Sequence, residues 1–108
     1  MLLADGRVRR AYLGLVSAPT PLPGPLAERT GRRVGLRVVE VVPGAPAERA
    51  GLHRGDLVLT VGRIPVAEAQ SLQRLLFADA IGRPLPITVV RNGAMVDVIA
   101  VPAELTEG

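Results

Sequence analysis

The chain has 108 residues, the length of one domain, and 48% of them are apolar, which is enough to form a buried core. Its formal charge of +3 is mild and it has one tyrosine, one phenylalanine and no tryptophan, so it lacks the basic stripe with stacking aromatics that nucleic-acid binding requires. No apolar run approaches the length of a membrane-spanning helix and cysteine is absent, which argues against direct membrane insertion and excludes disulfides, thiolate metal sites and a cysteine nucleophile.

The first third of the chain predicts a strand, a proline-rich break, a helical turn and a second strand. Residues 10–18 are typical of a strand that follows a loop, although Gly14 interrupts the apolar run. Residues 19–25, PTPLPGP, are expected to lie outside any regular ladder, because proline lacks the N–H donor. A short helical turn is expected over 26–30, and the β-branched run VGLRVVEVV predicts a strand over 34–42.

The middle of the chain predicts two helices separated by a strand. Residues 45–50 have a proline in the first turn and a glycine just after the end, which is typical of a short helix. Residues 57–62, LVLTVG, predict a strand that continues briefly over 63–66. Residues 67–80 predict the longest helix, because apolar residues recur on one face at Leu72, Leu75 and Leu76.

The last third of the chain predicts a β-hairpin. Residues 86–91 and 94–101 are strand-like, and the Asn92-Gly93 pair between them favours a tight turn because both residues tolerate positive φ. The sum is five or six short strands and two helices. We therefore expect an α+β fold, a small β-sandwich or partly open barrel with a helix closing one side.

The sequence offers little for catalysis. His53 is the only histidine and lies in a turn signal, and neither Ser17 nor Ser71 lies in a G-x-S-x-G elbow. The four aspartates and six glutamates are scattered singly, without the spacing of a metal site, and no phosphate-binding glycine loop occurs. Asp56 is expected to brace its turn rather than to bind a ligand. We therefore expect a non-catalytic chain that has no cofactor and no metal site.

The tetrapeptide Tyr12-Leu13-Gly14-Leu15 is the best candidate for a binding site. Glycine weakens a strand, so its place between two leucines needs a reason, such as close approach of the backbone to a ligand. A loop that enters a strand here can point successive N–H groups at one spot and hold an anion, including the terminal carboxylate of a peptide. The alternative that stays open on this tetrapeptide alone is an ordinary strand start with core leucines.

The order of the elements and four sequence strings together resemble a PDZ domain. The strings are GRVRRAYLGL, VVEVVPGAPAERAGLHRGDLVLTVGRIPV, SLQRLL and ITVVRNGAMVDVIAV, and they cover nearly the whole chain. The lead-in DGRVRRAYLGL is similar to the junction between the trypsin-like protease domain and the PDZ domain in bacterial HtrA (Deg) serine proteases. The resemblance implies the circularly permuted, HtrA-type strand order, with residues 1–8 as a linker from an upstream protease domain, 9–103 as the PDZ domain and 104–108 as a tail.

The same resemblance implies a carboxylate-binding loop at 12–15, in which three successive N–H groups are the donors and an arginine precedes the loop. The two leucines of the loop would form the floor of a pocket, and the next two residues would pair with the peptide backbone. The leucines of the 67–80 helix would form the opposite wall. The expected peptide-binding residues are Arg10, Tyr12, Leu13, Gly14, Leu15, Val16, Ser17, Leu72, Leu75 and Leu76.

By this resemblance the chain is a peptide-binding module that captures hydrophobic C-termini by strand addition. It would thereby recruit substrate to, or regulate, a trypsin-like serine endopeptidase. Ligands with an apolar last residue are expected, and residues 69–71 hold no histidine that would indicate Ser or Thr at the third-from-last position. The family setting implies the cell envelope, in the periplasm or another extracytoplasmic space.

Two other interpretations stay open. PDZ modules also occur in tail-specific proteases, intramembrane metalloproteases and secretion components, so the parent protein can differ while the fold stays the same. The proline-rich insertion at 19–33 supports a second alternative. If this insertion or a partner domain covers the groove, the chain is a structural interaction domain that does not bind free C-termini.

Overall fold

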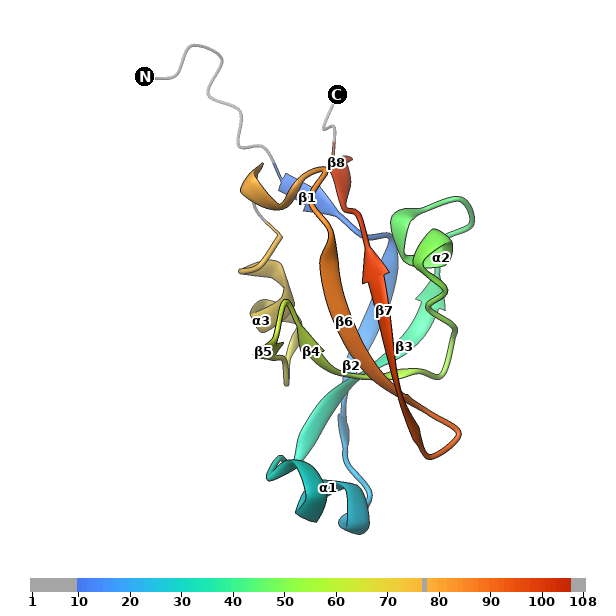
Figure 1. Cartoon of the computed structure of the whole chain (residues 1–108), viewed down its shortest axis with the longest axis vertical. Coiled ribbons are helices and arrows are strands. Elements are labelled where there is room, and N and C mark those ends of the chain that lie inside the picture. Colours follow the sequence, from blue (N-terminus) through green and yellow to red (C-terminus); the bar gives the residue numbers. More distant parts are fainter. Residues whose placement is uncertain (1–9, 77, 106–108) are drawn as a thin grey trace.

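The computed structural model describes residues 10–76 and 78–105, so the linker expected at 1–8 lies outside them. The described strands form two antiparallel sheets, with β1 paired to β8 in one and the order β2-β3-β4-β6-β7 in the other, where β5 also pairs with β4 (Figure 1). The strands are β1 (Arg10–Tyr12), β2 (Leu15–Pro21), β3 (Val34–Val41), β4 (Leu57–Val61), β5 (Ile64–Pro65), β6 (Leu85–Arg91), β7 (Ala94–Ala100) and β8 (Ala103–Leu105). The α-helices are α1 (Gly24–Thr30), α2 (Pro46–Ala50) and α3 (Ala69–Gln73), with a 3₁₀ turn at Ala78–Ala80.

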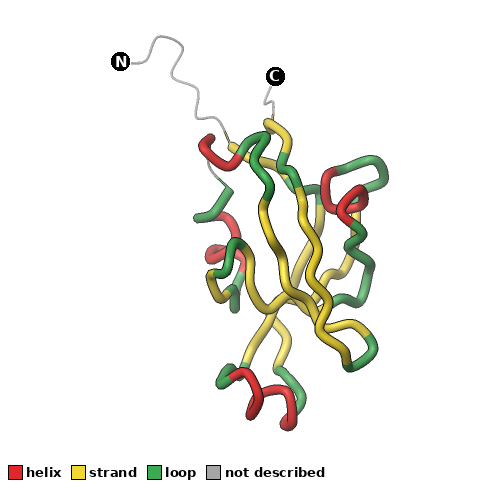
Figure 2. The backbone as a smooth tube through the Cα atoms, in the orientation of Figure 1, coloured by secondary structure: helices red, strands yellow, loops and turns green. Residues whose placement is uncertain are grey.

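The expected α+β class is confirmed, and the described part of the chain holds more short elements than the sequence indicated. Figure 2 shows the helices as short pieces around the strands, and no barrel closes among the described residues. Three α-helices are present in this part rather than two, because the turn expected at 26–30 is a helix that starts at Gly24. The strands β1, β5 and β8 are only two or three residues long, which is why they lack a period-2 signature.

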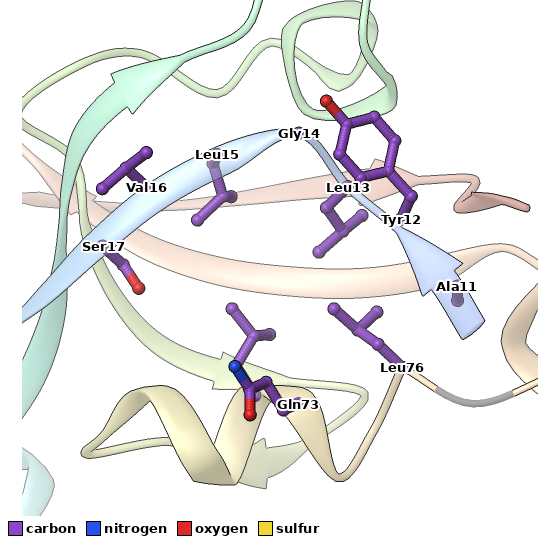
Figure 3. Close-up of a pocket in the computed structure, with 10 residues that line it drawn as sticks. Ala11, Tyr12, Leu13, Gly14, Leu15, Val16, Ser17, Gln73 and Leu76 are labelled. Carbon is purple, nitrogen blue, oxygen red and sulfur yellow. The ribbon is translucent and has the colours of Figure 1, made fainter. Parts of the chain in front are cut away.

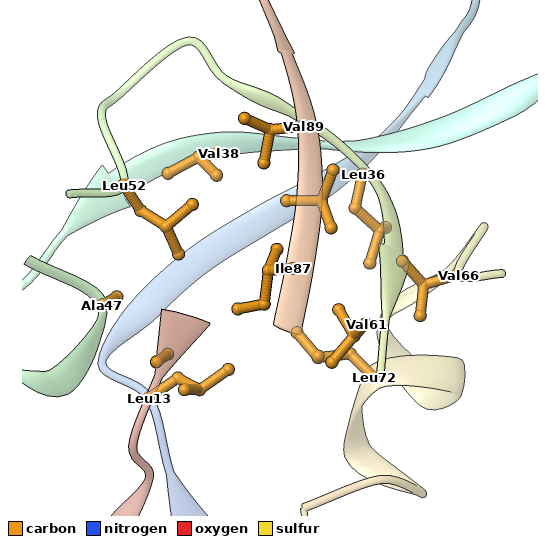
Figure 4. Packing of buried hydrophobic residues seen from close by; sticks show 12 residues of the cluster. Leu13, Leu36, Val38, Ala47, Leu52, Val61, Val66, Leu72, Ile87 and Val89 are labelled. Carbon is orange, nitrogen blue, oxygen red and sulfur yellow. The ribbon is translucent and has the colours of Figure 1, made fainter. Parts of the chain in front are cut away.

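The main core lies between the inner faces of β3, β4 and β6, and α2 and α3 close it at two sides (Figure 4). Leu36, Val38, Val61, Ile87 and Val89 are each at most 1% exposed. Burying one such side chain contributes about 1.5–3 kcal/mol, so these strands supply much of the stability of the fold. They form the frame against which the candidate site is built.

A second, smaller cluster lies on the opposite face of β4. Leu57 and Leu59 point there and pack against Leu22 and, less completely, against Leu26 and Ala27 of the α1 region. The guanidinium of Arg32 donates to the carbonyl of Leu59 over 2.6 Å. The insertion at 19–33 is thus attached to the outer face of β4.

Residues 19–25 were expected to form no regular strand pairing, and this is wrong for the first three of them. Pro19, Thr20 and Pro21 are part of β2 and pair with β3. The N–H of Leu22 donates to the carbonyl of Arg33 over 2.8 Å, so this pair faces β3 and, by alternation, positions 19 and 21 face away from it. The nitrogens of the two prolines therefore face the free edge of β2, so no hydrogen bond to β3 is lost. Prolines in strands generally lie at such edge positions.

The expected helix at 67–80 is also wrong in its length. The α-helix ends at Gln73, and the next turns are tightened, because the N–H groups of Leu75 and Leu76 donate to carbonyls three residues back. The carbonyl of Leu76 then accepts the N–H of Ala11 in β1, over 3.0 Å. In a longer helix this carbonyl would accept an N–H from the next helical turn, but here the N–H of β1 occupies it.

Asp56 braces the turn before β4, as its sequence position indicated. Its side chain is buried and accepts the backbone N–H of His53 at 2.8 Å and the guanidinium of Arg91 at 2.6 and 2.8 Å. Arg91 also donates to the carbonyl of Gly51. Burial alone raises the pKa of Asp56, but the hydrogen bonds from Arg91 and His53 outweigh it, so the pKa lies below its usual value. This pair joins the end of α2 to β6.

Two hairpin turns follow the same physical rule, although only one was predicted. The Asn92-Gly93 turn joins β6 to β7 with φ of 53° and 79°, as its residue types indicated. The turn between β4 and β5 is formed by Gly62 and Arg63, with φ of 60° and 68°. Arginine carries no turn signal, so the sequence showed only a continuation of the strand there.

The short sheet of β1 and β8 joins the two ends of the described chain. Arg10 pairs with Leu105 and Tyr12 with Ala103. Regular structure therefore extends two residues beyond the domain boundary expected at 103, into the segment expected to be a tail.

Candidate functional site: an apolar groove between β2 and α3

A groove of about 280 Å³ lies between the start of β2 and α3 (Figure 3). Eight of the ten residues expected to bind a peptide line it: Tyr12, Leu13, Gly14, Leu15, Val16, Ser17, Leu72 and Leu76. Ala11 and Gln73 complete the lining. No charged residue belongs to this set, so the groove is suited to an uncharged, mainly apolar chain segment.

Gly14 lines the groove and has no substitute among the L-amino acids. Its φ is +80°, a backbone conformation that residues other than glycine rarely adopt. A Cβ on this residue would lie 2.2 Å from the Cβ of Ala45 and 3.0 Å from the hydroxyl of Tyr12. The glycine is therefore required by backbone conformation and by space together, which explains why it interrupts an apolar run.

The start of α2 and the segment just before it fix the orientation of this loop. The carbonyl of Leu13 accepts the N–H of Ala47 at 2.8 Å, and the carbonyl of Gly14 accepts the N–H of Val42 at 2.8 Å. Both carbonyls thus point away from the groove. The PGAPA string of the sequence supplies part of this support, and Ala45 and Ala47 are small enough to let the loop approach.

Backbone donors remain available in the loop at the start of β2. Within residues 10–76 and 78–105, no acceptor receives the N–H of Leu13 or of Gly14. Because the Gly14–Val42 pair faces β3, the alternation of an antiparallel strand turns the N–H of Leu15 to the free edge of β2. Consecutive unpaired N–H groups form the kind of nest that binds a carboxylate or another anion.

The side walls of the groove are apolar. On the β2 side, Leu13 is 3% exposed and Leu15 is half-buried, and Figure 3 shows both side chains pointing toward α3. On the opposite side, Leu72 of α3 and Leu76, which follows the helix, both line the groove. The side chain of Val16 points the other way and is 50% exposed, and its backbone groups face β3 like those of Gly14, so Val16 borders the groove without presenting a backbone donor or acceptor to it.

Two of the expected residues do not line the groove. Arg10 is exposed on β1 and lies outside the lining set, so nothing at the groove surface depends on its side chain. Leu75 packs against the main core instead. The leucine pattern indicated an apolar helix face, but it did not show which leucines line the groove and which pack only against the core.

Sequence reasoning missed Ala11 and Gln73. Gln73 directly follows Leu72 and lies beside Leu76 at the groove, where Figure 3 shows its amide. Its polar character placed it off the apolar face that the periodicity predicted. Ala11 contributes through β1, whose pairing with β8 has no signal in the sequence.

The insertion at 19–33 does not cover the groove. None of its residues is among the lining set, and α1 packs instead on the outer face of β4. Figure 1 places α1 at the end of the molecule away from β1. The idea that the insertion blocks the site is therefore not supported by the fold.

Neither a metal cluster nor a membrane-spanning helix accompanies the groove in the described part of the chain. The residues that the structure describes contain no cluster of three or more histidine, cysteine or acidic side chains placed to hold a metal ion. Among the helices described, none is long and apolar enough to cross a membrane.

Comparison with known proteins identifies the family. Residues 12–100 match the family model described as PDZ domain. The chain is 34% identical over 95 residues to "Probable periplasmic serine endoprotease DegP-like" of Ectopseudomonas mendocina, which covers 86% of this chain and 20% of that protein. The chain thus spans about a fifth of the length of this curated relative.

Solved structures of related proteins superpose well. The structure "HtrA-type protease AlgW with decapeptide" has a TM-score of 0.75 at 28% identity, over 96% of this chain and 32% of that one. A PDZ domain of HtrA3, bound to a phage-derived ligand of sequence FGRWV, has a TM-score of 0.67 at 22% identity, over 90% of this chain and 88% of that one. These similarities confirm the expected PDZ-like fold of the HtrA type.

Proposed function

This chain belongs to the PDZ domain family, in the form found in HtrA-type and DegP-like serine proteases, and from that membership we propose that its groove binds the free C-termini of proteins. The ligand adds as a strand to the open edge of β2, with its terminal carboxylate at the N–H groups of Leu13, Gly14 and Leu15. The observation that carries the proposal is the combination of unpaired donors and an apolar groove at one place.

The groove favours an apolar last residue. Leu13, Leu15, Leu72 and Leu76 surround the space next to the donor loop. The HtrA3 ligand FGRWV ends in valine, and the AlgW structure holds a decapeptide, which supports a similar use of this groove. A contact area of a few residues lies at the small end of protein interfaces, so we expect dissociation constants in about the micromolar range.

The parent protein is proposed to be a trypsin-like serine endopeptidase in the periplasm or another extracytoplasmic space. The names of the curated relatives support both points. Within such a protein the chain would be the non-catalytic part, and capture of a C-terminus would recruit a substrate or change the activity of the protease domain. The alternative of a structural module with a covered groove has lost its main argument, because α1 lies elsewhere.

An amide NMR titration tests the proposal. A peptide ending in Val or Leu is titrated beside its C-terminally amidated twin. We expect shifts at Leu13, Gly14, Leu15 and along α3 with the free acid alone. Equal shifts from both peptides would point to internal segments as ligands, and no shift with several apolar peptides would overturn the proposal.

A further inference from the structure

The larger sheet ends at β7, whose outer edge has no partner strand among the described residues (Figure 1). The carbonyl of Pro86 accepts the N–H of Gly62, which directly follows β4, so the neighbours of Pro86 in β6 turn their backbone groups toward β7. The residues of β7 that pair with these neighbours are even-numbered. By alternation, the N–H and C=O groups of Met95, Asp97 and Ile99 point away from the sheet, where no described backbone group pairs with them.

This edge lacks the features that usually protect an edge strand. Protected edges are short, are bent by a bulge, or carry prolines or several charges. The strand β7 has seven residues, none of them proline, and its register with β6 shows no shift. The open edge of β2, by contrast, has two prolines and a register shift. Of these two edges, β7 is therefore the one that offers a regular template for pairing with another chain.

Both faces of β7 are incompletely covered. On the outer face Ile99 is 62% exposed, and Met95 and Val101 are half exposed. On the inner face Val96 and Val98 pack against the main core but stay partly exposed. A helix or a flat protein surface covers one face only, whereas a strand added in line with the sheet borders both. The edge therefore fits a strand that is itself apolar on both faces.

We propose that the occupant of this edge is β7 of a second copy of the chain, paired antiparallel about a two-fold axis. A two-fold interface requires a surface that is complementary to itself. The strand β7 meets this requirement, because it offers unpaired backbone groups and has apolar residues on both faces.

The charge of Asp97 selects the register of the pair. It is the only charged residue of β7, and placing it opposite its own copy would bring two carboxylates together, which is destabilising. A shift of two residues places Asp97 opposite Ile99 of the second copy and Met95 opposite Val101. Asp97 keeps its hydrogen bond from the hydroxyl of Thr88 within its own chain, at 2.6 Å.

The size of the contact predicts a weak dimer. A few apolar side chains and one strand of backbone from each copy bury on the order of 1,000 Å² in total, at the lower limit for a specific interface. We expect a dissociation constant of about 0.1 mM. The groove beside β2 stays open in this dimer, because β2 and β7 lie at opposite ends of the strand order.

Sedimentation velocity of the chain, from about 10 μM to about 1 mM, measures the association. The mass should rise from one chain toward two and no further, because the two-fold pair leaves no β7 edge free. Ile99→Lys places a charge in the contact and should raise the dissociation constant by at least about tenfold. Ile64→Lys is the matched control, since Ile64 is 48% exposed on β5, and its dissociation constant should stay within about twofold of the wild type.

The register can be tested by cross-linking, because the chain contains no cysteine. In the proposed register Val98 lies opposite Val98 of the second copy in a non-hydrogen-bonded pair, with Cα atoms about 4.5 Å apart, which is within the range of a disulfide. Val98→Cys should therefore form a linked dimer when oxidised glutathione is added. Val96→Cys, on the same face of β7 but not opposite itself, should form far less.

The outcomes decide between this contact and others. A monomer at every concentration would overturn the proposal and leave the edge to a strand of another protein. A dimer that survives Ile99→Lys, or that links no better through Val98→Cys than through Val96→Cys, would place the contact or its register elsewhere and overturn it too. Continued growth in mass would indicate pairing of β7 with β2 of the next copy, a head-to-tail contact that contradicts the two-fold pair.

Discussion

The Cβ of Ala45 stands 2.2 Å from the place that a Cβ on Gly14 would occupy. The two residues come from segments 31 positions apart in sequence, and the hydrogen bond from the N–H of Ala47 to the carbonyl of Leu13 keeps them in contact. The donor loop of the groove is thus shaped by packing against the segment before α2. Any side chain at position 14 must displace that segment or change the loop.

Gly14→Ala is expected to abolish peptide binding and to lower stability. The positive φ costs about 1 kcal/mol for a residue with a Cβ, and the overlap with Ala45 adds to that cost. Chemical denaturation measures the loss of stability, and peptide titration measures the loss of affinity. Gly44→Ala is the control, because Gly44 has a φ of +78° but nothing within 4 Å of a built Cβ.

The control should lose about 1 kcal/mol of stability and keep its affinity for the peptide. Adding Ala45→Gly to Gly14→Ala should recover part of the stability, since it removes the atom that overlaps. If Gly14→Ala is no more costly than Gly44→Ala, the close approach of the two segments is not what constrains position 14.

Asp56→Asn is expected to cost about 2–3 kcal/mol, because the buried carboxylate receives charge-assisted hydrogen bonds from Arg91. Asp97→Asn is the matched control. Asp97 is exposed and accepts one hydroxyl from Thr88, so its loss should change the stability by less than about 0.5 kcal/mol. Urea denaturation at neutral pH measures both values.

The same residue predicts a loss of stability in acid. The pKa of Asp56 is lowered in the folded protein, so its stabilising contribution is present above the unfolded pKa of about 3.9 and is lost as the pH falls through the folded value. The unfolding free energy should therefore fall below about pH 4 in the wild type and fall less in Asp56→Asn. Equal slopes in the two proteins would contradict a lowered pKa at this site.

Arg63→Gly should stabilise the domain by about 0.5–1 kcal/mol. Arg63 has a φ of 68° in the tight turn between β4 and β5, a conformation that is costly for a residue with a Cβ and free for glycine. Arg54→Gly serves as the comparison, because Arg54 is exposed and is not among the residues with positive φ. It should be neutral or destabilising in the same denaturation experiment.

Pro19 should limit the length of the ligand that the groove contacts. Four-residue and eight-residue peptides with the same C-terminus should bind the wild type within about twofold of each other, because the β2 edge offers no donor at position 19. Pro19→Val restores that donor and should tighten the longer peptide by about threefold, without changing the shorter one. Anisotropy with both peptides measures the effect, and a wild type that already gains from length would contradict it.

Elements with strong local chemistry could be predicted from residue types. The β-branched run before Pro43 predicted β3, and Asn92-Gly93 predicted the last hairpin, because residue type alone restricts φ at those positions. The strings around Gly14 and residues 43–56 carried the family resemblance, and with it eight of the ten residues that line the groove. The sequence predicted that Asp56 braces its turn, but only the folded structure shows that its partner is Arg91.

Tertiary structure decided the features in which distant segments compete for the same backbone groups. The helix expected over 67–80 ends at Gln73, and the carbonyl of Leu76 accepts the N–H of Ala11, a hydrogen bond between residues 65 positions apart. The prolines at 19 and 21 fit a strand only because their missing donors face the open edge, which depends on the register with β3. Neither register nor helix rotation is visible in residue types, since both are set by what the rest of the chain packs against them.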